Sequence, residues 1–301
     1  MKPMPLCSLQ PGALWPALIA RTERALACGA LHPIETMQTA IDDNGLRFVV
    51  RQVSSLLLKP HVDTAEPRSF VDPFLPYDPD LFVADVSATH VALLNKYNVL
   101  PHHLLIVTRA FEPQEALVDL ADFTAWLACL DEFDGLGFYN GGREAGASQP
   151  HKHMQVVPLP LGDAGLSLPI APLLEAARFH GPIGRLPGFP FEHAFARLTP
   201  GPLEQAAAQA LERYRMLLDA VGVASLIVEG RAHQGAPYNL LLTPRWMLLV
   251  PRSSEDAAGI SVNSLGFAGS FFVKNAEQLA VLRRIGPMTT LRRVGLPRRG
   301  T

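Results

Sequence analysis

The stretch His151-Lys-His-Met-Gln-Val-Val-Pro158 (HKHMQVVP) decides how this chain is interpreted. Side chains alternate between the two faces of an extended strand, so His151, His153 and Gln155 are predicted to share one face. Two imidazoles and an amide in one row are costly to bury without a use. The stretch is therefore predicted to be a strand that carries a functional site.

The residues just before this strand are glycines and small residues, NGGREAGASQP at 140–150. Such a loop brings backbone N–H groups close to an anion. A phosphate-binding loop that leads into a strand with two histidines indicates phosphoryl or nucleotidyl transfer through histidine.

His153 is the candidate nucleophile. Neutral imidazole is a good nucleophile at about pH 7 and a good leaving group once phosphorylated, so it splits one displacement into two. Its second ring nitrogen needs an acceptor, which the backbone carbonyl of His151 or of a neighbour would supply. The His151 ring is expected to hydrogen-bond a phosphate oxygen or the leaving group, and Gln155 to donate to a non-bridging oxygen.

The spacing of these residues alone leaves two other interpretations open. A His-x-His pair in a strand is a common half of a zinc or iron site, which would need further ligands from His90, His102, His103, Glu144 or His233. The histidines could also be purely structural. The sequence contains no P-loop motif, no dinucleotide-binding fingerprint and no nucleophile elbow.

Composition limits the class of protein. Apolar residues make up 48% of the 301 residues and charged residues 18%, which excludes global disorder. The net charge of −2 argues against an extended nucleic acid as the main partner, but not against a small phosphorylated ligand. Three scattered cysteines indicate free thiols in a reducing compartment. With no membrane-length apolar run and no clean signal peptide, a cytoplasmic protein is expected.

Hydrophobic periodicity predicts a mixture of helices and strands. Helices are predicted at 14–31, 119–133, 202–221, 276–285 and 288–294, and strands at 46–58, 81–86, 90–94, 104–108, 138–140, 152–157, 225–229, 238–243 and 246–251. A half that carries the histidine strand, 1–165, is predicted to precede a second half, 166–301. The stretch PHHLLIVTR at 101–109 faintly matches PRWMLLVPR at 244–252, which would suggest a duplication.

The run GASQPHKHMQ at 146–155 resembles the active-site segment of diadenosine tetraphosphate phosphorylases, also called ATP adenylyltransferases. The resemblance continues in segments from about residue 59 to residue 274, among them DPFLP at 72–76, LNKY at 94–97 and NSLGFAG at 263–269. This family belongs to the histidine triad superfamily, in the branch close to galactose-1-phosphate uridylyltransferase, where a glutamine replaces the third histidine. Gln155 matches that glutamine.

The resemblance implies an α+β fold, in which an antiparallel sheet of the histidine triad type is packed with helices and built from two related halves. It implies that His153 takes AMP onto its imidazole, that His151 supports the phosphate and that Gln155 completes the catalytic set. No metal ligand is implied. Family contacts to phosphate and nucleoside match Lys59, Asn95, Lys96, Asn140, Gly146, Ala147, Ser148, Gln149, Asn263, Ser264, Leu265, Ser270 and Lys274.

By this resemblance the expected reaction is phosphorolysis of diadenosine tetraphosphate. His153 attacks the α-phosphorus and expels ATP, and inorganic phosphate then releases the AMP as ADP. Two alternatives stay open: a relative with another acceptor, such as a hexose phosphate or water, and a nucleotide-binding protein without turnover. No tightly bound cofactor is expected, although Mg²⁺ would accompany the polyphosphate. The partners expected are small nucleotides rather than nucleic acid or membrane, for a monomer or small homo-oligomer.

Overall fold

The computed structural model describes residues 7–53, 72–163 and 167–298. Its centre is one ten-stranded sheet in the order β3-β4-β5-β7-β6-β13-β14-β10-β9-β8, in which every neighbouring pair is antiparallel. This is the α+β fold that the sequence predicts. The strands are β3 (Phe82–Asp85), β4 (His90–Leu94), β5 (Leu104–Thr108), β6 (Gly135–Gly141), β7 (His153–Pro158), β8 (Arg178–His180), β9 (Ile183–Arg185), β10 (Ala194–Arg197), β13 (Tyr238–Thr243) and β14 (Trp246–Pro251).

Smaller sheets surround this central one. A three-stranded sheet joins β1 (Thr36–Asp43) and β2 (Leu46–Val53) to β17 (Ser270–Val273), which runs parallel to β2. Two short hairpins pair β11 (Ser225–Val228) with β12 (Arg231–Gln234), and β15 (Asp256–Ala257) with β16 (Ile260–Ser261). The part of the predicted 46–58 strand beyond residue 53 lies outside the described residues.

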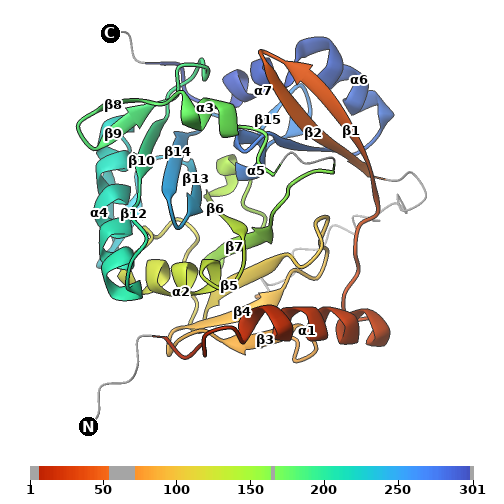
Figure 1. Cartoon of the computed structure of the whole chain (residues 1–301), viewed down its shortest axis with the longest axis vertical. Helices are drawn as coiled ribbons and strands as arrows, with labels where there is room; N and C mark the ends of the chain where they lie inside the picture. The colour runs from red at the N-terminus through yellow and green to blue at the C-terminus, as the bar shows by residue number, and fades with distance from the viewer. Residues whose placement is uncertain (1–6, 54–71, 164–166, 299–301) are drawn as a thin grey trace.

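Helices cover the central sheet in two groups (Figure 1). The first group, α1, α2 and α4, packs on one face through a core that includes Leu18, Phe123 and Tyr214. The second group packs with the three-stranded sheet on the other face, around Phe48, Phe267 and other apolar residues. None of the described helices is long and apolar enough to cross a membrane. The helices are α1 (Leu14–Cys28), α2 (Leu120–Leu130), α3 (Ala171–Glu175), α4 (Leu203–Val221), α5 (Ser264–Phe267), α6 (Ala276–Ile285) and α7 (Pro287–Val294).

The pleat of β7 separates two kinds of side chain, as its alternating pattern predicts. Met154 and Val156 point into the core under the first helix group. His153 and Gln155 point to the opposite face, where they line a cavity. The same strand therefore serves as a core element on one face and carries functional groups on the other.

The two halves of the central sheet repeat one arrangement. The order β4, β5, α2, β6, β7 along the first half has the counterpart β9, β10, α4, β13, β14 in the second, with the same strand neighbours in each. Gln155 pairs with Leu105 in the first half, and Leu248 pairs with Phe195 in the second. Aligned from their first residues, HMQVVP of β7 matches WMLLVP of β14, and Trp246 then corresponds to His153.

The register corrects one detail of the predicted duplication. The match of 101–109 with 244–252 would pair β5 with β14, but the sheet order makes β14 the counterpart of β7 and β10 the counterpart of β5. Buried central strands are all rich in Leu, Ile and Val, so apolar patterns alone do not distinguish them. The two halves share one strand order, in which β14 and not β5 takes the place of the strand compared.

Lys152, the residue just before β7, connects this strand to α2 on the face of the sheet opposite the cavity. Its side chain is 1% exposed, and its ammonium contacts the Asp122 carboxylate and donates to Leu117 O at 3.0 Å. The other Asp122 oxygen lies 3.0 Å from His90 Nε2. A buried charge is tolerated when it is paired and hydrogen-bonded. This contact fixes α2, β4 and β7 relative to one another, immediately behind the histidine face.

Candidate active site

The candidate site is a cavity of about 580 Å³ on the face of the central sheet opposite α1, α2 and α4. Residues from the first half form one wall, and residues from 261–278 of the second half form the other. The structure brings eleven of the predicted site residues to this cavity: Asn95, Lys96, Asn140, Gly146, Ser148, Gln149, His153, Gln155, Asn263, Leu265 and Lys274.

His153 is held with one ring nitrogen inside the protein. Its Nδ1 lies 2.8 Å from the carbonyl oxygen of His151. A carbonyl only accepts hydrogen bonds, so Nδ1 carries the proton and Nε2 keeps its lone pair. The side chain is buried at 4% exposure on the cavity wall. The geometry is that of an imidazole prepared for nucleophilic attack through Nε2.

Burial also sets the charge of His153. Desolvation lowers its pKa to about 4, the hydrogen bond to the His151 carbonyl opposes this shift, and the charge of His151 adds to it. Because the pKa lies below the ordinary value for histidine, the ring is neutral near neutral pH. The nucleophile is therefore present in its active form without a general base.

The pH profile of the free enzyme follows from this pKa. The nucleophile is lost only when the pH falls through about 4, where His153 becomes protonated. We expect kcat/KM to show no limb from His153 between about pH 5 and pH 8. Stopped assays across this range check the prediction, and an acid limb in this range that coincides with protonation of the His153 ring, followed by nuclear magnetic resonance, would overturn it.

Gln155 is oriented by a chain of side chains. His103 Nε2 donates to Gln155 Oε1 at 2.9 Å, and Asn95 Nδ2 donates to His103 Nδ1 at 3.2 Å. Burial lowers the pKa of His103 to about 4, so the ring is neutral and this pattern of donors is fixed. Since Oε1 is occupied, Gln155 presents its amide N–H groups to the cavity that it lines.

Gln114 is a site residue that the sequence analysis did not identify. It is fully buried, and its Oε1 accepts from the His153 backbone N–H at 2.9 Å. Its Nε2 donates to the Asn140 carbonyl at 2.9 Å. Gln114 thus links the nucleophile strand to the start of the glycine-rich loop, although it lies far from both in sequence.

The glycine-rich loop leaves β6 as a tight turn. Gly142 and Gly146 have φ values of 90° and 89°, which favour glycine, and they flank the short 3₁₀ helix Arg143–Ala145. The N–H groups of Gly146 and Ala147 bond to carbonyls within the loop. The following residues, Ser148 and Gln149, line the cavity. Ala147, a predicted substrate contact, has its N–H bonded within the turn and does not line the cavity.

Gly146 provides a test of the loop. A Cβ on this residue would lie 3.1 Å from Asn263 and would also strain the positive φ. We expect Gly146→Ala to raise KM for a nucleotide substrate about fivefold, the effect of roughly 1 kcal/mol, with kcat retained. Steady-state kinetics measure both constants.

Gly181→Ala is the matched control for this variant. Gly181 also has a positive φ, of 64°, but a Cβ added there would meet nothing within 4 Å. The control carries the same type of backbone strain without a neighbour in the site. Equal KM values for the two variants would rule out a role of the loop conformation in binding.

Asn140 joins the two walls of the cavity. Its Oδ1 accepts from Ser264 N at 3.0 Å, Ser264 Oγ at 2.7 Å and Asn239 Nδ2 at 3.0 Å. With its oxygen occupied by three donors, Asn140 presents its amide nitrogen to the cavity. Ser264, a predicted substrate contact, is fully buried behind Asn140 and does not line the cavity.

Two other residues predicted to contact substrate have their polar atoms bonded within the protein. Ser270 is fully buried, and its hydroxyl accepts from the Arg51 guanidinium at 3.2 Å. The His151 ring is fully buried, with Asp72 on one nitrogen and Thr108 on the other, and it is not among the residues that line the cavity. In both cases a protein partner occupies the polar atoms that were expected to bind substrate. Lys59 lies outside the described residues.

The metal interpretation finds no ligand set in residues 7–53, 72–163 and 167–298. No group of three or more His, Cys, Asp or Glu side chains there could hold an ion. His90 contacts Asp122 on the far side of the sheet, and His103 contacts Gln155. Each of these histidines has a side-chain partner instead of convergent ligands.

Sequence comparisons match both halves of the chain to known families. Residues 4–176 match the Ap4A phosphorylase N-terminal domain, and residues 187–297 match the ATP adenylyltransferase C-terminal domain. Two Saccharomyces cerevisiae proteins are each 28% identical. Diadenosine 5',5'''-P1,P4-tetraphosphate phosphorylase 2 aligns over 77% of this chain and 78% of its own, and Protein APA1 over 81% and 80%. The division of the chain at residue 165 stays a prediction.

Structure comparisons agree with these matches. Yeast Ap4A phosphorylase Apa2 has a similar fold, with a TM-score of 0.74 at 23% identity over 97% of this chain and 100% of that one. The same yeast enzyme in complex with Ap4A gives a TM-score of 0.75 at 25% identity over 95% and 98%. The chain belongs to the Ap4A phosphorylase and ATP adenylyltransferase family of nucleotidyltransferases.

Proposed function

We propose that this protein phosphorolyses diadenosine tetraphosphate to ATP and ADP through an AMP group on His153. The observation that carries the proposal is the orientation of this ring. Nδ1 is committed to the His151 carbonyl, so the lone pair of Nε2 is left for a substrate in the cavity. The family and the complex of yeast Apa2 with Ap4A support this choice of substrate.

The first displacement forms the Nε2–P bond. The electron pair of Nε2 attacks the α-phosphorus, and the P–O bond to the departing polyphosphate breaks with its electrons on oxygen, which releases ATP. Amide donors from Gln155 and Asn140 face the cavity, where they would stabilise charge on the non-bridging oxygens. Lys96 and Lys274 line the same cavity and would neutralise the polyphosphate.

The second displacement transfers AMP to inorganic phosphate. A phosphate oxygen attacks the phosphorus, the N–P bond breaks, and its electron pair returns to Nε2 as ADP leaves. Because the dinucleotide and inorganic phosphate bind beside His153, each displacement becomes an effectively unimolecular step within the complex. We propose that Mg²⁺ enters as a complex of the polyphosphate, with Asn and Lys contacts supplied by the protein.

The shape and lining of the cavity suit a dinucleotide. Its volume of about 580 Å³ falls in the range of small-molecule sites. Phe74, Tyr77, Tyr97 and Phe272 line it and offer aromatic faces on which bases stack. We therefore propose that polar groups at the centre hold the phosphates, while the aromatic side chains hold the nucleosides.

Product analysis tests the acceptor. The purified protein is incubated with diadenosine tetraphosphate with and without inorganic phosphate, and nucleotides are separated by chromatography. The expected products are ATP and ADP in equal amounts over many turnovers when phosphate is present, and at most one ATP per protein molecule, with no ADP, when it is absent. Production of ATP and AMP without phosphate would identify a hydrolase instead, and nucleotide binding without products would identify a non-catalytic protein.

A further inference from the structure

Asp72 and His151 form a partly buried contact beside the nucleophile, in which the His151 ring is buried and Asp72 is 14% exposed. Asp72 Oδ2 lies 2.8 Å from His151 Nδ1. On the other side of the ring, Nε2 lies 2.9 Å from both the backbone oxygen and Oγ1 of Thr108. The reaction proposed above uses neither Asp72 nor the His151 ring, although both are close to His153.

Both nitrogens of the His151 ring face acceptors. A carboxylate oxygen and a carbonyl oxygen accept hydrogen bonds and cannot donate them, so the contacts with Asp72 and with the Thr108 carbonyl are both hydrogen bonds only when each ring nitrogen carries a proton. The Thr108 hydroxyl can donate to an unprotonated Nε2, but the carbonyl would then face a lone pair. A ring with both protons is an imidazolium cation, and Asp72 supplies the opposite charge. We propose that Asp72 holds His151 as a doubly protonated imidazolium, and that this pair positions and electrostatically tunes His153.

The surroundings of the His151 ring fit a single ion pair. Asp72 comes from the loop before β3, and Thr108, at the end of β5, is uncharged. Two phenylalanine rings pack on His151 at centroid distances of 5.6 and 5.4 Å. The titratable neighbours along the chain are His153 and Lys152, and the Lys152 ammonium is paired with Asp122. The side chains in contact with the ring are Asp72, Phe74, Thr108 and Phe111.

The pair is connected to His153 in two ways. The backbone carbonyl of His151 accepts the His153 Nδ1 proton at 2.8 Å. Asp72 Oδ1 accepts from the Phe74 N–H at 2.9 Å, and the Phe74 ring packs against both histidines. Asp72 therefore fixes the residue that orients the nucleophile and the ring that covers it.

The cation also affects the reaction, and this part of the inference rests on the proposed function. When Nε2 of His153 bonds to phosphorus and Nδ1 keeps its proton, the adenylylated ring carries a positive charge. An imidazolium at residue 151 repels that charge. It thereby weakens the Nε2–P bond and favours the return of the electron pair to Nε2 when phosphate attacks. The expected consequence is a faster second displacement.

Asp72→Asn isolates this effect. Asparagine keeps both hydrogen bonds, since its oxygen accepts from Phe74 N and its nitrogen donates to His151 Nδ1, but His151 then carries one proton and no charge. We expect phosphate-dependent loss of the AMP adduct to slow roughly tenfold, because the repulsion between the His151 cation and the adenylylated His153 ring is lost. Formation of the adduct should not become slower. Rapid-quench intact mass spectrometry measures the two steps separately.

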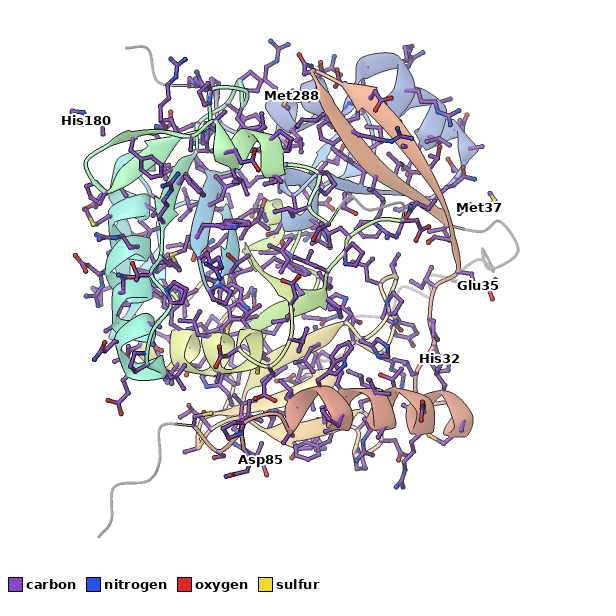
Figure 2. All side chains as sticks on the ribbon, viewed as in Figure 1. His32, Glu35, Met37, Asp85, His180 and Met288 are labelled. Atoms are coloured by element: carbon purple, nitrogen blue, oxygen red, sulfur yellow. The ribbon has the colours of Figure 1, made fainter. Side chains whose placement is uncertain are left out.

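Asp85→Asn is the matched control. Asp85 pairs with Arg109 at an exposed position and lies at the lower edge of the molecule in Figure 2, away from the cavity lining. We expect this variant to keep both rates. Equal slowing of both steps in Asp72→Asn would indicate a merely structural residue and would overturn the inference.

Nuclear magnetic resonance of ¹⁵N-labelled histidine tests the charge of His151 without catalysis. We expect protons on both ring nitrogens in the native protein near neutral pH and on one nitrogen in Asp72→Asn. A single ring proton in the native protein would refute the inference even if turnover proceeds as proposed. If no adduct forms in the native protein, the proposed function fails, and the resonance of His151 still decides its protonation.

Discussion

Replacing His153 with alanine is expected to reduce turnover of diadenosine tetraphosphate by about 10⁴-fold or more, because the variant has no group that can accept AMP. The Nε2 atom of this ring faces the cavity while Nδ1 is held by a carbonyl. Binding of nucleotide should persist, since the loop, the lysines and the amide donors remain in place. Continuous assays of ATP release and equilibrium binding separate these two effects.

His180→Ala is the control for this substitution. His180 is an exposed histidine of β8 and is labelled at the upper left margin of the molecule in Figure 2, far from the nucleophile strand. The His180→Ala substitution removes the same type of side chain at a position outside the site, so turnover of this variant should equal that of the native protein. Native-like turnover in His153→Ala would mean that the reaction does not pass through this residue.

Gln155→Leu is expected to lower kcat by about 10²- to 10³-fold with a smaller change in KM, because it removes amide donors that act on developing charge. Leucine has a volume similar to that of glutamine but no polar group, so the variant removes the amide from the cavity wall. The substitution also leaves the His103 N–H without its acceptor at 2.9 Å. Steady-state kinetics and a thermal unfolding curve distinguish lost catalysis from lost folding.

Gln205→Leu provides the comparison for this variant. Gln205 is exposed on α4, outside the cavity lining, and its replacement should change neither constant. A Gln155→Leu protein that raises KM and keeps kcat would show that Gln155 serves ground-state binding and not the transition state.

The catalytic strand was predictable because its signal is local. Side chains at 153 and 155 share a face by the period of a strand alone, and His151 supplies its carbonyl from two residues away. The helix at 276–285 and the strands at 90–94, 104–108, 238–243 and 246–251 have the predicted bounds because apolar patterns and turn residues mark them. The helix predicted at 14–31 ends earlier, at Cys28, since Gly29 adopts a φ of 76° that terminates it.

Other elements were not predicted because their sequence carries no period. β1 has an irregular, largely polar pattern and is held by its pairing with β2. The strands β8, β9 and β10 are three or four residues long and lie in a segment rich in glycine and proline. In such short segments tertiary pairing determines the conformation and local propensity does not.

The supporting residues of the site depend on contacts between distant segments. Gln114 reaches His153 across 39 positions, and Asp72 reaches His151 across 79. No spacing rule indicates such partners. For the same reason the resemblance assigned substrate contacts to Ser264 and Ser270, whose hydroxyls are in fact used by Asn140 and Arg51. The motif identifies which side chains carry chemistry, whereas the fold determines which of them reach the cavity.

Trapping the covalent intermediate tests the central claim most directly. The protein is mixed with diadenosine tetraphosphate in the absence of phosphate, and its intact mass and fragment masses are recorded. We predict a mass gain of one AMP located on His153, which disappears when phosphate is added as ADP forms. Turnover without any adduct, or an adduct on a different residue, would contradict the account.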